Sequence, residues 1–229
     1  MPSLVGSEMC IRDRRDGNDV SYITQVGTGN YNERTSKLYT DLTLMTADRD
    51  FGSDASVVFN ALAVGNTVES TNKLLVAPKG LKSRIVELID NEITYKDKGY
   101  IGIKMNSLTD KDIIEKLAEA SRAGVKIELV VRGICCLIAG VEGDTENIRV
   151  ISIVGRFLEH SRIYIFGTGD RRRVYISSAD FMTRNTERRV EVAAPLLDKS
   201  IADRAVEIFE TMLRDNVKAR EQDSDGNYY

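Results

Sequence analysis

The order of apolar segments in the middle of the chain constrains its fold most strongly. Three short segments rich in apolar and β-branched residues have the length of buried strands: residues 74–77, 100–105 and 126–131. The two stretches between them, 81–93 and 110–123, carry apolar side chains at helical spacing. Strands that alternate with helices predict an α/β fold with a mixed, mostly parallel sheet flanked by helices. Ligands of such sheets bind at the carboxyl ends of strands, where Asn106 and Arg132 stand here.

The rest of the chain extends this pattern on both sides. Before the central segments, a strand is predicted over 20–26, a helix over 54–63 and a polar connection over 64–72. After them come four apolar strand segments and a helix: 150–154, 162–166, 174–177, 190–193 and 201–213. The polar tail after Asn216 is expected to fray.

Composition narrows the class of protein. Of 229 residues, 42% are hydrophobic and 29% charged, which is enough for a sizeable core. The sequence has no run of about 20 apolar residues, the length that crosses a bilayer, and no signal-peptide pattern. We therefore expect a cytoplasmic protein. Cys135 and Cys136 fit no disulfide framework or metal motif and are expected in the core. A formal net charge of −3 argues against nucleic acid as a partner.

The single histidine, His160, lies in a strongly basic stretch. Nine arginines and no lysine stand between Arg149 and Arg189, against four acidic residues. Arginine binds phosphate oxygens bidentately and keeps its charge, so a histidine among arginines indicates a site for a polyanion. The alternative is an ion-paired surface, which suits the run 171–173 better.

Two loops follow strands and end in a small amide or carboxylate residue. One is the glycine-rich stretch 27–32, and the other is 177–180 followed by Arg184 and Asn185. The first lacks both the lysine of a P-loop and the third glycine of a dinucleotide-binding loop, so a plain turn is its alternative. Their similar position after a strand suggests two related halves.

This arrangement resembles the phospholipase D superfamily, in which each half has a His-x-Lys motif on one strand and a Gly-Ser-x-Asn-type turn. Here His160-Ser161-Arg162 and 177–180 represent the second half. A closer resemblance, to the carboxy-terminal catalytic region of bacterial polyphosphate kinase, runs from about Asp16 to Tyr229. It rests on these segments in this order: GTGNYNERTSKLYTDL, LLVAPKGL, IKMNSLTD, VVRGICCL, ENIRVISIVGRFLEHSRIYIFG, SSADFMTRN and RRVEV.

The resemblance implies a reaction and its site residues. In the family, ATP phosphorylates a histidine, which passes the phosphoryl group reversibly to inorganic polyphosphate with Mg²⁺. Tyr39 matches the tyrosine that packs on the nucleotide base, Arg132 the arginine at the ATP phosphates, and His160 a histidine that contacts the nucleotide and assists transfer. Without the family, Tyr39 reads as a core residue and Arg132 as half of an ion pair. Further candidates to face phosphate or support the site are Asn106, Arg162, Asp180 and Asn185.

One departure from the family pattern bears on activity. The phosphorylated histidine of the family would fall near Gly6–Glu8, where this sequence has none. We therefore treat residues 1–15 as an unmatched leader, 16–68 as the remnant of a first catalytic domain and 69–229 as a second. We expect two phospholipase D-like lobes, of which the first is truncated, and a fragment that is inactive alone. Its Mg²⁺ ligands would lie outside the fragment. Apolar surface should be exposed beside the truncated first lobe.

The resemblance also implies a homo-oligomeric, cytoplasmic full-length protein that associates with membranes in some settings. Two other functions stay open. A phospholipase D-like phosphodiesterase would hydrolyse a diester without ATP and would normally have lysine in place of Arg162. A non-catalytic polyphosphate-binding module would fit the missing histidine.

Overall fold

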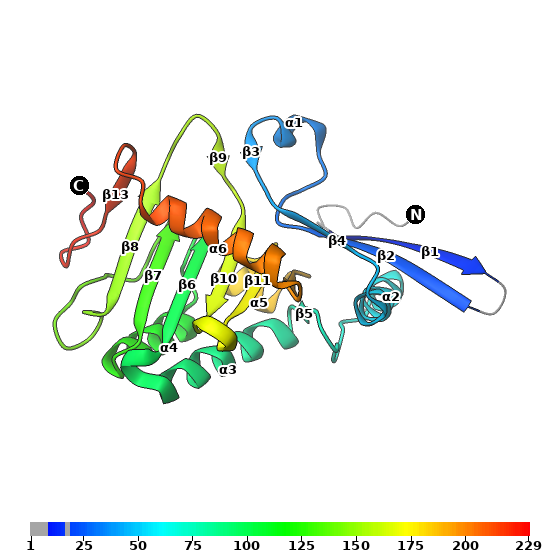
Figure 1. Ribbon diagram of the computed structural model, residues 1–229, viewed down its shortest axis with the longest axis horizontal. Helices are drawn as coiled ribbons and strands as arrows, with labels where there is room; N and C mark the ends of the chain where they lie inside the picture. The colour runs from blue at the N-terminus through cyan, green and yellow to red at the C-terminus, as the bar shows by residue number, and fades with distance from the viewer. Residues whose placement is uncertain (1–8, 17–18) are drawn as a thin grey trace.

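A computed structural model describes residues 9–16 and 19–229 of the chain (Figure 1). Its main sheet has eight strands in the order β13-β8-β7-β6-β10-β11-β12-β5. In chain order these are β5 (Leu75–Val76), β6 (Tyr100–Met105), β7 (Lys126–Val131), β8 (Ile148–Ile153), β10 (Arg162–Phe166), β11 (Arg173–Ser177), β12 (Val192–Pro195) and β13 (Ala219–Glu221). Seven of the eight match predicted strands with ends shifted by at most two residues, and the eighth, β13, was not predicted.

The mixed α/β class is confirmed, but the sheet is not mostly parallel. Only β6, β7 and β8 run parallel, and the other neighbouring strands are antiparallel. Helix α4 (Lys111–Arg122) carries the chain from the end of β6 back to the start of β7, as a parallel connection requires. Residues 167–172 are all that separate β10 from β11, and so short a connection allows only an antiparallel pair.

Helices cover both faces of the main sheet (Figure 1). Helix α3 (Gly80–Tyr95) packs with α4 on one face, and α6 (Lys199–Leu213) covers the other. Strand β10 feeds both layers because its side chains alternate: Ile163 belongs to the α6 cluster and Tyr164 to the α3 cluster, and both are fully buried. Two separate hydrophobic clusters therefore hold the sheet between its helices.

The N-terminal part forms a smaller antiparallel sheet of β1 (Met9–Asp16), β2 (Asp19–Gly27) and β4 (Thr43–Thr46), with α2 (Arg49–Ala63) packed beside it. The predicted strand over 20–26 is confirmed. Helix α2 begins before residue 54 because Asp48 accepts hydrogen bonds from the backbone N–H groups of its first turn.

The expected leader falls partly within this sheet. Residues 1–8, which include the position expected for the family's phosphorylated histidine, lie outside the described residues. The following residues form β1, which pairs with β2 from Met9 opposite Val26 to Asp16 opposite Asp19. Sequence periodicity did not indicate this strand.

Short elements connect the two parts. They are α1 (Glu33–Ser36), β3 (Tyr39–Thr40), β9 (Leu158–Glu159), α5 (Thr183–Glu187) and the 3₁₀ segments Lys96–Lys98 and Gly169–Arg171. Strands β3 and β9 pair in parallel, which ties the N-terminal part to the segment just before β10.

Two further expectations are wrong. The tail does not fray after Asn216, because β13 pairs with β8 and the buried Gln222 accepts a hydrogen bond from the backbone N–H of Ala139. The cysteines do not both lie in the core, since Cys136 is exposed and Cys135 is half-buried. No helix in the described part of the chain is long and apolar enough to span a membrane.

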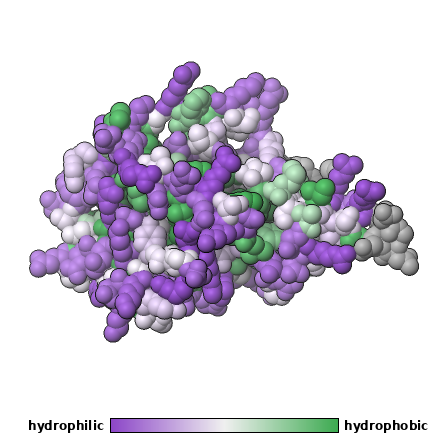
Figure 2. Space-filling view, in the orientation of Figure 1, coloured by the Kyte–Doolittle hydropathy of each residue, from purple (hydrophilic) through white to green (hydrophobic). Residues whose placement is uncertain are grey.

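Apolar side chains reach the surface between the two sheets (Figure 2). A groove of about 420 Å³ lies between β4 and α6, and Met45 and Ile201 on its walls are 64% and 44% exposed. Exposed apolar surface therefore lies beside the N-terminal part.

The buried carboxylate of Asp54 fixes the connection between the two parts. It projects from α2 and accepts hydrogen bonds from the backbone N–H groups of Asn72, Lys73 and Leu74 at 2.6–3.0 Å. These donors have no helix or sheet partner, so the carboxylate supplies the hydrogen bonds that β5 needs at its entry.

We predict that Asp54→Ala lowers the free energy of unfolding by about 3 kcal/mol, because it leaves the backbone donors unpaired. Asp50→Ala, on the exposed side of the same helix, should cost less than about 1 kcal/mol. Urea denaturation of both variants measures the difference, and equal losses would contradict this role for Asp54.

Candidate active site

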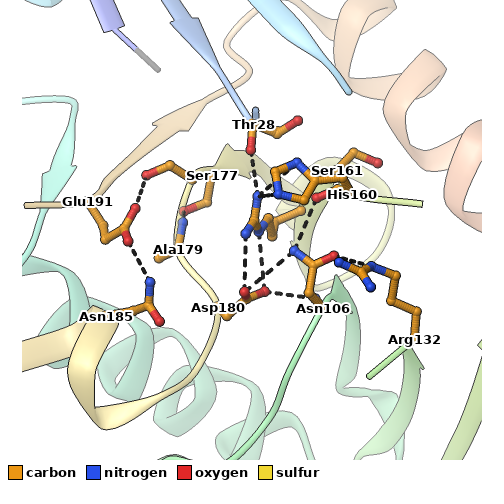
Figure 3. Close-up of polar contacts among 12 residues, drawn as sticks. Thr28, Asn106, Arg132, His160, Ser161, Ser177, Ala179, Asp180, Asn185 and Glu191 are labelled. Atoms are coloured by element: carbon orange, nitrogen blue, oxygen red, sulfur yellow. Dashed lines mark hydrogen bonds and ion pairs between the residues drawn. The ribbon is translucent and has the colours of Figure 1, made fainter. Parts of the chain in front are cut away.

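The candidate site lies where β6, β7 and β11 end and β10 begins (Figure 3). Asn106 follows β6 and Arg132 follows β7, as predicted from the strand pattern. His160 precedes β10, and Asp180 stands in the loop after β11. The site therefore occupies the carboxyl edge of the parallel strands, completed by an antiparallel hairpin.

Arg162 is the buried centre of the site. Its Nε and Nη2 donate to the two carboxylate oxygens of Asp180 at 3.2 and 3.1 Å, and its Nη1 donates to the Thr28 carbonyl at 2.6 Å. Burial opposes its charge, but Asp180 more than offsets this and raises the pKa of Arg162. The guanidinium thus holds both loops singled out in the sequence rather than an open phosphate position.

His160 is held by a carboxylate from the N-terminal part. Its Nδ1 lies 2.9 Å from Oδ1 of Asp41, which also accepts a hydrogen bond of 2.7 Å from the Thr28 hydroxyl. An ionised carboxylate only accepts, so Nδ1 donates to Asp41, and on the other side of the ring Nε2 lies 3.2 Å from Nη1 of Arg162. The Tyr39 ring packs against the imidazole, with ring centroids 4.7 Å apart.

Asn106 links the remaining site residues. Its Oδ1 accepts a hydrogen bond of 2.6 Å from Arg132 Nε, and its Nδ2 donates to the His160 carbonyl at 3.3 Å. Its backbone N–H donates to Asp180 at 2.7 Å. Burial lowers the pKa of Arg132, although a guanidinium stays charged at any physiological pH.

Asn185 belongs to a separate buried cluster. Its Nδ2 and the Ser178 hydroxyl each donate to the Glu191 carboxylate at 2.5 Å, and burial raises the pKa of Glu191. The Oδ1 of Asn185 is buried without a hydrogen-bond partner. The structure thus brings together Tyr39, Asn106, Arg132, His160, Arg162 and Asp180, but not Asn185.

Sequence reasoning missed Asp41, Thr28 and Glu191. Asp41 stands two residues after Tyr39 in a segment already singled out, but an acidic residue after a short strand carries no signal of its own. Part of the basic stretch forms ion pairs away from the site, and Arg149 pairs with Glu221. Arg171 pairs with Glu92 and Arg172 with Asp203, as the alternative reading of 171–173 expected.

Gly29 explains why the first loop is rich in glycine. A Cβ atom at this position would overlap the carboxylate of Asp41. Glycine therefore leaves room for the acid that holds His160, and the loop presents the Thr28 carbonyl to Arg162.

Known proteins share the fold and the family features of this chain. A phospholipase D family member from Salmonella typhimurium matches with a TM-score of 0.50 at 17% identity, covering 66% of this chain and 97% of that one. The fold is phospholipase D-like. The family model "Polyphosphate kinase C-terminal domain 2" matches residues 74–229, and "Polyphosphate kinase C-terminal domain 1" matches residues 3–68. The chain belongs to the polyphosphate kinase family.

Individual relatives agree with this assignment. Polyphosphate kinase from Bacillus cereus is 49% identical over 97% of this chain, and that from Helicobacter pylori is 44% identical over 98%. The crystal structure of polyphosphate kinase from Porphyromonas gingivalis superimposes with a TM-score of 0.87 at 42% identity, covering 94% of this chain and 34% of that one. The chain spans about a third of the length of the relatives it matches.

We predict that Gly29→Ala detaches His160 from Asp41, because the new methyl group takes the place of the carboxylate. Nuclear magnetic resonance can follow this directly, since the chain has one histidine. The hydrogen-bonded Nδ1 proton signal should be present in the unaltered chain and lost in the variant. Gly80→Ala, where a Cβ meets open space, is the control and should keep the signal. A Gly29→Ala protein with an unchanged signal would contradict the assignment.

Proposed function

We propose that this chain carries the nucleotide-facing half of the site at which a polyphosphate kinase transfers the terminal phosphate of ATP to inorganic polyphosphate. The observation that carries the proposal is the fixed His160 imidazole, whose Nδ1 lies 2.9 Å from the Asp41 carboxylate and whose Nε2 lies 3.2 Å from Nη1 of Arg162. In this role Tyr39 packs on the base, Arg132 binds the ATP phosphates, and His160 contacts the nucleotide and assists transfer.

The local chemistry supports these roles. Asp41 holds the imidazole at Nδ1 and Arg162 meets it at Nε2, so His160 has a fixed position from which to contact the nucleotide. Asn106 occupies only the Nε of Arg132, so the two Nη groups form the fork that meets phosphate oxygens. The positive charge of this fork stabilises the negative charge that spreads over the phosphoryl oxygens during transfer. Asn106, Arg162 and Asp180 form the hydrogen-bonded layer that supports Arg132 and His160.

We propose further that the chain alone binds nucleotide without turnover. Its single histidine is His160, and the family's phosphorylated histidine has no counterpart in the sequence. We also propose that residues 16–68 and 69–229 belong to two successive catalytic domains, which the family matches to 3–68 and 74–229 support.

The site residues do not fit a protein-held Mg²⁺. In the described part of the chain, no three His, Cys, Asp or Glu side chains gather as metal ligands. Asp41 and Asp180 are already engaged by His160, Thr28, Arg162 and Asn106. We propose that Mg²⁺ arrives as part of the ATP complex.

We also propose that the full-length protein is a cytoplasmic homo-oligomer able to associate with membranes.

A chimera tests the proposed function. Residues 19–229 would replace the equivalent region of the Bacillus cereus enzyme, which leaves that enzyme's own preceding segment in place. We expect the chimera to transfer phosphate from radiolabelled ATP to polyphosphate. Arg132→Ala and His160→Ala should each lower kcat by about 100-fold, because each removes a group that acts on the transferring phosphate.

Arg173→Ala is the matched control, because this arginine is exposed on the main sheet away from the site. It should leave the rate unchanged. Full activity of the His160→Ala chimera would reject the assignment of His160. Polyphosphate binding with no transfer in the unaltered chimera would favour a binding module, and diester hydrolysis without ATP would favour a phosphodiesterase.

A further inference from the structure

Lys104 is a fully buried lysine beneath the site. It lies in β6, opposite Ile163 of the neighbouring β10, and only 1% of its surface is exposed. Its Nζ donates to the carbonyl of Glu159 at 3.0 Å and to the carbonyl of Ser161 at 2.7 Å. These are the residues on either side of His160, and no proposed step of the reaction uses Lys104.

The backbone around His160 is held from two directions. Asn106, two residues after Lys104, donates to the carbonyl of His160 itself, so side chains from the end of β6 bind three consecutive carbonyls. On the other side, the N–H of Ser161 donates to the Thr40 carbonyl at 3.0 Å, close to Asp41. The contacts of Lys104 fix the distance between the His160 segment and β6. On the other side, Asp41 follows β3, and its carboxylate meets the imidazole of His160.

We propose that Lys104 is a positioning residue that holds the backbone on both sides of His160 and so keeps its imidazole in register with Asp41. The proposal rests on the proposed function of His160, but the geometry it describes can be measured without turnover.

The charge of Lys104 is consistent with a backbone-binding role. Burial lowers its pKa to about 8, although the Glu159 carboxylate, 4.0 Å away, favours the charged form. The other charged groups around it are Asp41, Arg162 and Arg132. Both the ammonium and the neutral amine carry at least two N–H donors, enough for the two carbonyls, so the contact should persist as Lys104 loses its charge. A side chain without donors would leave the Ser161 carbonyl buried and unpaired.

Substitution of Lys104 tests the proposal in the full 229-residue chain. In Lys104→Met, the Ser161 amide should exchange with solvent about tenfold faster or more, and the Nδ1 proton signal of His160 should weaken. Amides of β7 should keep their protection. Lys111→Met, at a lysine whose side chain is 83% exposed, is the control and should change neither readout. Lys104→Arg, which retains donors, should restore both at least in part.

Unchanged exchange at Ser161 together with an unchanged His160 signal in Lys104→Met would overturn the proposal. If that variant does not fold, the unaltered chain provides the test. The Nζ protons of Lys104 should then show scalar couplings across hydrogen bonds to the carbonyl carbons of Glu159 and Ser161, and their absence would overturn the proposal equally. Neither readout involves ATP, so an inactive chimera would reject the proposed function and leave this test unaffected.

Discussion

The arrangement depends on one buried cation, the guanidinium of Arg162. A charge removed from water is costly unless it is paired and fully hydrogen-bonded, and here Asp180 and the Thr28 carbonyl together satisfy all three of its nitrogens. Asp180 comes from the main sheet and Thr28 from the N-terminal part. The two parts must therefore meet at this point for the charge to be tolerated, which places Asp41 beside His160.

This contact also explains why the two loops carry small residues. Gly29 leaves space for the Asp41 carboxylate, and the loop after β11 turns so that Asp180 can accept from Arg162 and from the backbone N–H of Asn106 at once. Neither loop is an anion cradle of its own. Both loops complete the surroundings of Arg162 and His160, and Arg132 is the arginine that we propose meets phosphate.

Much of the fold followed from sequence periodicity because long apolar patterns report burial directly. The helices over 81–93 and 110–123 and seven of the eight strands of the main sheet were predicted within about two residues. Strand direction was predicted less well, since it depends on connection length, and β10 and β11 are joined too closely to be parallel. Strand β1 was missed because it is mostly polar, although its partner β2 follows it directly, and the short β13 was missed because its partner β8 lies far back in the sequence.

The site was predictable only in part. Strand ends located Asn106 and Arg132, and the family resemblance supplied roles for Tyr39, Arg132 and His160, but no local pattern links Asp41 to a histidine 119 residues later. Such pairs arise from tertiary packing. The same holds for Lys104, whose sequence context is that of any strand residue, and whose partners are carbonyls in the segment just before β10.

We propose that this chain forms a nucleotide site around His160. It is tested most directly by titrating the unaltered chain with the magnesium complex of ATP while following the ring signals of its single histidine by nuclear magnetic resonance. We expect a saturable shift of these signals that Arg132→Ala abolishes. Ring signals that stay unchanged at millimolar ATP, while the Nδ1 proton still reports the contact with Asp41, would contradict it.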